Sequence, residues 1–136
     1  MTNLVGLQLS NNPVGDPSVL AGLSNLSTLL LDTTSITDIG FLRGLTELQS
    51  LSLVGNFVTD LTPLASLIRL NWVYLDSNPL LTDIQPLLDN PGLISSTPCG
   101  AGTTLCHEVG LRGTSVSCTD VAALEAKPLF VFSDCP

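Results

Sequence analysis

The stretch LTELQSLSLVGNFVTDLTPLASL, residues 45–67, decides the fold of this chain. Its inward-type residues include Leu48, Leu51 and Leu53, and Asn56 follows the last of these leucines by three positions. Leucines at alternate positions are typical of a short strand with one buried face, because successive side chains of a strand point to opposite faces. The stretch therefore predicts a short strand followed by a turn that buries an amide side chain.

The same pattern recurs along the 136-residue chain with a step of 22 residues. It starts at Leu4, Leu26, Leu48 and Leu70, and a fifth, distorted copy around Val109 follows an irregular insert. Self-similarity with this period indicates a solenoid, in which each repeat stacks on the next and buries a continuous core. The sequence therefore predicts one elongated repeat domain.

The pattern L-x-x-L-x-L-x-x-N-x-L resembles leucine-rich repeats, and the segments TDIGFL, TDLTPL and TDIQPL make it similar to the internalin-like, phosphatase-regulator-like class. The resemblance implies an α/β solenoid. Its right-handed coil would have a short parallel β-sheet on the concave face, short 3-10 or helical turns on the convex face and a C-terminal helix-plus-strand cap. We expect four repeats with an uncapped N-terminal end in residues 1–93, and an irregular last repeat with a disulfide-bearing cap of the same domain in residues 94–136.

One polar residue of each repeat is expected to face inward. A buried amide must be hydrogen-bonded, and an asparagine can satisfy it by bonding the backbone of adjacent coils. A threonine substitutes with a single hydroxyl. This structural ladder comprises Asn12, Thr34, Asn56, Asn78 and Thr114.

An aspartate precedes the convex-side turn in three repeats. Asp38, Asp60 and Asp83 are expected to be N-caps of short helical turns, where a carboxylate accepts unpaired N–H groups. An aligned acidic row that binds calcium is the alternative, and capping is favoured over it.

All four cysteines fall in the last 38 residues, where a solenoid needs a cap. We prefer the disulfide pairs Cys99–Cys106 and Cys118–Cys135, while the other two connectivities stay open. Disulfides indicate an oxidising compartment and hence an extracellular or cell-surface protein, with a cytoplasmic protein that keeps its thiols free as the alternative.

The segment CTDVAALEAK predicts the cap helix. Thr119 or Asp120 is expected near its N-cap, and Val121, Leu124 and also Ala123 are expected to face inward. LFVF predicts a closing strand.

Composition argues against several functions. Four Lys or Arg stand against twelve Asp or Glu, a formal charge of −8, which disfavours nucleic acid as a partner. No apolar run is long enough for membrane insertion. His107 is the chain's only histidine and no nucleotide-binding loop occurs, so we expect neither an enzyme nor a cofactor. Zinc binding by Cys99, Cys106 and His107 is disfavoured because no C-x-x-C pair is present.

The outward positions of the strands predict three columns on the concave face, where an unknown protein or glycan would bind. The only Trp and only Tyr, Trp72 and Tyr74, lie two residues apart on one strand and therefore face the same way. Exposed aromatic residues are enriched as interface anchors. The alternative is that Trp72 packs against the irregular insert. The predicted partner-binding residues are Trp72, Tyr74, Asp76, Leu30, Asp32, Val54, Gln8 and Ser52.

Met1 aligns with a repeat leucine, which predicts an open N-terminal coil able to self-associate, or a fragment of a longer solenoid. Two other roles stay open at this stage. The repeats would be a spacer with binding elsewhere, or the protein would be a cytosolic regulator.

Overall fold

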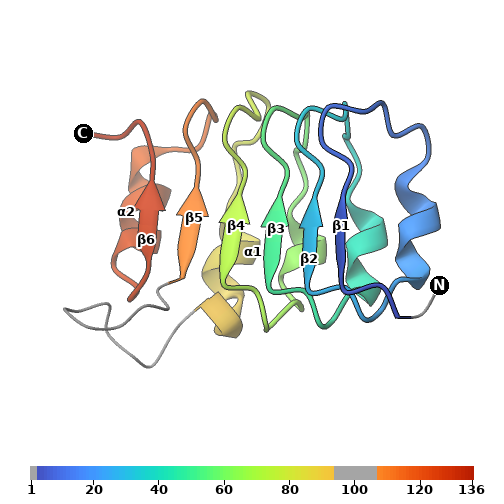
Figure 1. Cartoon of the computed structure of the whole chain (residues 1–136). Helices are drawn as coiled ribbons and strands as arrows, with labels where there is room; N and C mark the ends of the chain where they lie inside the picture. Colours follow the sequence, from blue (N-terminus) through green and yellow to red (C-terminus); the bar gives the residue numbers. More distant parts are fainter. Residues whose placement is uncertain (1–2, 94–106) are drawn as a thin grey trace.

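A computed structural model describes residues 3–93 and 107–136 of the chain. They form one sheet of six parallel strands in the order β1-β2-β3-β4-β5-β6, so each coil pairs with the next one (Figure 1). The leucine-rich-repeat solenoid predicted from the sequence is thereby confirmed. The strands are β1 (Gly6–Gln8), β2 (Thr28–Leu30), β3 (Ser50–Ser52), β4 (Trp72–Tyr74), β5 (Glu108–Gly110) and β6 (Phe130–Phe132).

Short helical turns form a second layer behind the sheet (Figure 1). In residues 3–93 and 107–136, four are 3-10 turns and two are α-helices, as expected for the convex side of a coil that must turn back within a few residues. They are η1 (Pro17–Gly22), η2 (Gly40–Gly44), η3 (Thr62–Leu64), α1 (Gln85–Asp89), η4 (Pro91–Leu93) and α2 (Cys118–Glu125).

The core lies between these two layers and runs along the solenoid. The central residue of each inner strand is buried and packs in register on its neighbour, as Leu29, Leu51, Val73 and Val109 do. Each such side chain contributes about 1.5–3 kcal/mol by leaving water. In the first coil, inward residues such as Leu4 and Leu7 are only partly buried, because one side of that coil has no neighbouring coil.

Asn56 makes the hydrogen bonds that the inward ladder requires. Its Oδ1 accepts from the backbone N–H groups of Thr34 (3.1 Å) and Ile36 (2.9 Å) of the preceding coil. Its Nδ2 donates to the carbonyls of Leu31 (2.8 Å) and Leu53 (2.9 Å). Asn56 is fully buried, and it therefore joins two coils from inside the core.

Asn78 repeats this arrangement one coil later, accepting from the N–H of Val58 and donating to the Leu53 and Leu75 carbonyls. The two threonines of the ladder, Thr34 and Thr114, each donate a hydroxyl to the carbonyl three residues before, at 2.7 Å.

The expectation of a buried Asn12 is wrong. Its side chain is exposed and donates only to the carbonyls of Leu9 and Ser10 in its own coil. Among the described residues, no backbone N–H of another coil donates to its Oδ1.

The aspartates before the convex turns cap backbone groups, but from one position earlier than expected. Asp38, Asp60 and Asp83 accept the N–H two residues ahead at 2.7–2.8 Å, and the N-cap residue itself is the following apolar residue. Hydrogen bonds from the backbone N–H of Thr62, and then from its hydroxyl, lower the pKa of Asp60. Asp16, which the sequence reasoning missed, does the same for Ser18 and is the true N-cap of η1.

The cap is a sixth coil. Val131 of β6 pairs with Val109 of β5, its counterpart 22 positions earlier, so the closing strand predicted from LFVF is confirmed. Val121 and Leu124 of α2 are buried as expected, whereas Ala123 is exposed.

The N-cap of α2 is Ser117, and Thr119 and Asp120 lie near it in the first turn, as expected. The Ser117 hydroxyl accepts from the Asp120 N–H at 3.1 Å, and a serine hydroxyl at this position satisfies a donor of the first turn.

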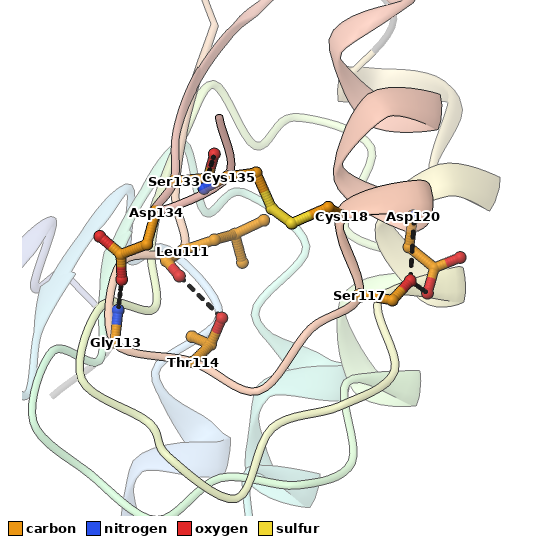
Figure 2. Close-up of a disulfide and its surroundings, with 9 residues drawn as sticks. All are labelled: Leu111, Gly113, Thr114, Ser117, Cys118, Asp120, Ser133, Asp134 and Cys135. Atoms are coloured by element: carbon orange, nitrogen blue, oxygen red, sulfur yellow. Dashed lines mark hydrogen bonds between the residues drawn. A yellow bond between two sulfur atoms is a disulfide. The ribbon is translucent and has the colours of Figure 1, made fainter.

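A disulfide joins Cys118 at the start of α2 to Cys135 after β6, which confirms one of the two preferred pairs (Figure 2). The Asp134 carboxylate next to it accepts from the Gly113 N–H at 2.6 Å, so the segment after β6 is also tied to the preceding coil. Cys99 and Cys106 lie outside the described residues.

Candidate partner-binding site

The strand register places two of the three predicted columns on the open face of the sheet. Strand register places Trp72 between Ser50 and Glu108, and Tyr74 between Ser52 and Gly110. The pairing with β6 adds a row that the sequence reasoning did not include. The first column is Gly6, Thr28, Ser50, Trp72, Glu108 and Phe130, and the second is Gln8, Leu30, Ser52, Tyr74, Gly110 and Phe132.

Four aromatic side chains therefore lie on β4 and β6, on either side of β5. Trp72 and Tyr74 are half-buried, while Phe130 and Phe132 keep 50% and 37% of their surface exposed. We name Trp72, Tyr74, Phe130 and Phe132 the aromatic patch. The two phenylalanines were missed as site residues, although aligning FVF with EVG, 22 positions earlier, would have placed them on this face.

A hydrogen bond connects β4 of the patch to β5, the strand between the two pairs of rings. The Tyr74 hydroxyl donates to Oε2 of Glu108 at 2.6 Å. Burial, then this hydrogen bond and the negative charges of Glu108 and Asp76, raise the pKa of Tyr74 to about 12 from its ordinary value of 10.0. The neutral phenol is therefore the form that the folded protein stabilises.

Because Tyr74 is the only tyrosine, its ionisation is visible in the ultraviolet absorbance without overlap. We expect tyrosinate to appear with a midpoint near pH 12. The folded-state pKa is above the unfolded one, so the contribution of this group to stability is complete below about pH 10 and disappears as the pH rises through the folded value.

Glu108→Gln should lower the midpoint, though not fully to the unfolded value because burial is the larger cause. The matched change Glu125→Gln on α2 should leave it unchanged. Circular dichroism at each pH shows whether the chain is still folded. A midpoint near 10 in the folded wild type would contradict the Tyr74–Glu108 hydrogen bond.

Two aspartates predicted to orient a partner are engaged by the scaffold. Oδ1 of Asp32 accepts from the Val54 N–H, and Oδ1 of Asp76 accepts from the Arg112 N–H, both at 3.0 Å. Each carboxylate thus caps the backbone of the next coil. The second oxygen of Asp32 also accepts, from the Ser10 hydroxyl at 3.4 Å, so a partner would meet mainly the second oxygen of Asp76.

The hydroxyl of Ser52 donates to the Asp32 carboxylate, and Ser52 keeps only 6% of its surface exposed. It therefore offers little surface to a partner. Leu30 and Val54 are half-buried beside it, and Gln8 is exposed on β1, three strands away from the aromatic patch.

Gly110 lies on β5 between the rings of the patch, and its lack of a side chain leaves room for two neighbouring side chains. A Cβ added there would lie 2.0 Å from Oδ2 of Asp76 and 3.2 Å from Cδ1 of Tyr74, so these two side chains occupy the space over the glycine. At the edge of the patch, the Arg112 guanidinium lies 5.4 Å from the centre of the Phe132 ring, a distance at which a cation is attracted to a ring face.

Within residues 3–93 and 107–136, no group of three or more His, Cys, Asp or Glu side chains is arranged to hold a metal ion. In the same residues, no helix has the length and apolar character needed to cross a membrane. Packing of Trp72 against the insert involves residues outside the described part.

These repeats and their open sheet face define a leucine-rich-repeat solenoid. Its repeats are internalin-like: the structure resembles an internalin (InlF) of Listeria monocytogenes with a TM-score of 0.77 and 30% identity, covering 97% of this chain and 36% of that one. It also resembles internalin C2 (InlC2) of the same organism with a TM-score of 0.63 and 30% identity, covering 97% of this chain and 62% of that one. The chain thus spans less than two thirds of either. No protein-family model and no curated protein matches it.

Proposed function

We propose that this solenoid binds a protein partner on the concave face of its sheet, with the aromatic patch as the anchor. The carrying observation is that four partly exposed aromatic side chains lie on β4 and β6, the two strands that flank β5. Large aromatic side chains supply much of the binding energy where they become desolvated at the centre of an interface. The similarity to internalins supports a protein-interaction module.

We also propose that the protein acts outside the cytoplasm, at the cell surface or after secretion. The disulfide Cys118–Cys135 supports this location, because such bonds persist in oxidising compartments and are rare in reducing ones.

The binding proposal is tested by selecting ligands for the immobilised chain from a displayed library of random peptides. Changing Trp72 and Tyr74 together to alanine is expected to lower the affinity of the selected peptides by about thirtyfold or more, the effect typical of interface anchors. Phe57→Ala is the matched control, because Phe57 is also aromatic and 46% exposed but lies outside the three columns.

Unchanged affinity of the double variant would place binding elsewhere on the molecule. Failure of the library to yield any ligand would favour the spacer role, in which these coils only extend a longer solenoid. Circular dichroism of each variant checks that the fold is retained.

A further inference from the structure

Glu108 is the charged residue at the centre of the aromatic patch. In the first column it lies directly between Trp72 of β4 and Phe130 of β6. Neighbouring strands are about 4.8 Å apart, so the two aromatic residues are separated by roughly 10 Å across Glu108. The register therefore places Glu108 between two aromatic residues of the open sheet face.

Within the part of the chain that the structure describes, one oxygen of this carboxylate accepts a hydrogen bond and the other does not. The Tyr74 hydroxyl donates to Oε2, and no other donor to Glu108 occurs in the part of the chain that the structure describes. Glu108 differs from Asp32 and Asp76 in the donor: its hydrogen bond comes from a side chain of the patch, whereas each aspartate accepts the backbone N–H of the next coil. Glu108 is also half-buried, so water screens its charge less than on an open surface.

The cationic residues of the chain leave this negative charge unpaired. Three of the four do not reach it: Arg69 pairs with Glu47 at 2.7 Å, Arg43 donates to the Thr62 hydroxyl, and Lys127 donates to the Leu88 carbonyl. Arg112 is the fourth, and it lies over Phe132. It lies in the turn after β5, and no ion pair joins it to Glu108 among the described residues.

We propose that the aromatic patch receives an arginine or lysine side chain of the protein partner, with the cationic group on Glu108 and the flanking apolar side chains on the four rings. This inference rests on the proposed function and specifies the chemistry of the partner. A cation at this position is attracted both by the carboxylate of Glu108 and by the aromatic rings of Trp72 and Phe130. The net charge of −8 additionally attracts a basic segment before contact.

The test uses two end-capped synthetic peptides, Ala-Leu-Arg-Leu-Ala and the same peptide with citrulline in place of arginine. Citrulline has nearly the same shape but no charge. Binding is followed by the fluorescence of Trp72, the only tryptophan, and by the amide NMR signals of β4 to β6. We expect the arginine peptide to bind about tenfold tighter than the citrulline peptide.

Glu108→Gln should remove this difference and leave the citrulline peptide unaffected. Glu125→Gln, the same loss of charge at an exposed site on α2, should preserve it. Phe130→Ala should weaken the binding of both peptides, because it removes an aromatic ring but no charge.

Equal binding of the two peptides to the wild type would overturn the inference, as would equal effects of Glu108→Gln and Glu125→Gln, or no binding of either peptide at the patch. Library peptides that are lost with the Trp72 and Tyr74 variant but are insensitive to Glu108→Gln would leave the proposed function standing and the cationic ligand wrong.

Discussion

Replacing Asn56 by leucine is expected to lower the free energy of unfolding by about 4 kcal/mol. The side chain is fully buried, and its loss leaves the N–H groups of Thr34 and Ile36 and the carbonyls of Leu31 and Leu53 without their partner. Each buried unpaired group costs about 1–3 kcal/mol, part of which the added apolar contact of leucine offsets. Urea unfolding followed by circular dichroism measures the difference.

Asn12→Leu is the matched control, since Asn12 occupies the same repeat position on the first coil but is exposed. It bonds only its own coil, so the expected loss is below about 1 kcal/mol. Similar losses for the two variants would mean that the asparagine acts within its own turn and not as a connection between coils.

Positions in the fold are predictable from the sequence wherever the 22-residue repeat is kept. Stacked coils repeat the same geometry, so a residue such as Trp72 is placed by its distance from Ser50, and the register bears this out. The same logic places Phe130 beside Glu108. The repeat is harder to see in β6, because only Val131 of its strand keeps the apolar repeat pattern.

Contacts made by residues outside the repeat positions cannot be predicted from the 22-residue step. Asn90 is fully buried and donates to the carbonyls of Leu64 and Leu67, although no ladder position predicts it. Its Oδ1 accepts from the N–H of Gly92, where an added Cβ would lie 1.9 Å from the Ile68 carbonyl oxygen. A glycine is required by this close approach of two backbones, which depends on three-dimensional packing and has no counterpart in the other repeats.

The hydrogen bond that organises the candidate site was unpredictable for a related reason. Tyr74 and Glu108 are 34 residues apart, and the insert between them interrupts the repeat. Alignment brings the two strands together, but whether the hydroxyl reaches the carboxylate depends on side-chain rotamers. Gly110 permits this arrangement, because it leaves room for the Tyr74 ring.

Removing the disulfide by changing both Cys118 and Cys135 to serine is expected to lower the free energy of unfolding by about 3 kcal/mol. The bond closes a loop with a sequence separation of 17, and a cross-link of that size restricts the unfolded chain by roughly this amount. The double substitution is preferred over a reducing agent because it leaves Cys99 and Cys106 unchanged. Changing both cysteines to alanine should give a similar loss; a much smaller one would assign the effect to the polarity of serine.

The consequence of that loss should be greatest at the aromatic patch. The loop contains α2 and β6, so Phe130 and Phe132 belong to the unit that the disulfide closes, whereas β3 lies well inside the solenoid. Amide hydrogen exchange is therefore expected to accelerate in α2 and β6 more than in β3. Equal acceleration of hydrogen exchange in β3 and β6 would mean that the cap unfolds together with the repeats. Selective acceleration in β6 would instead mean that the oxidised cap holds two of the four rings in place.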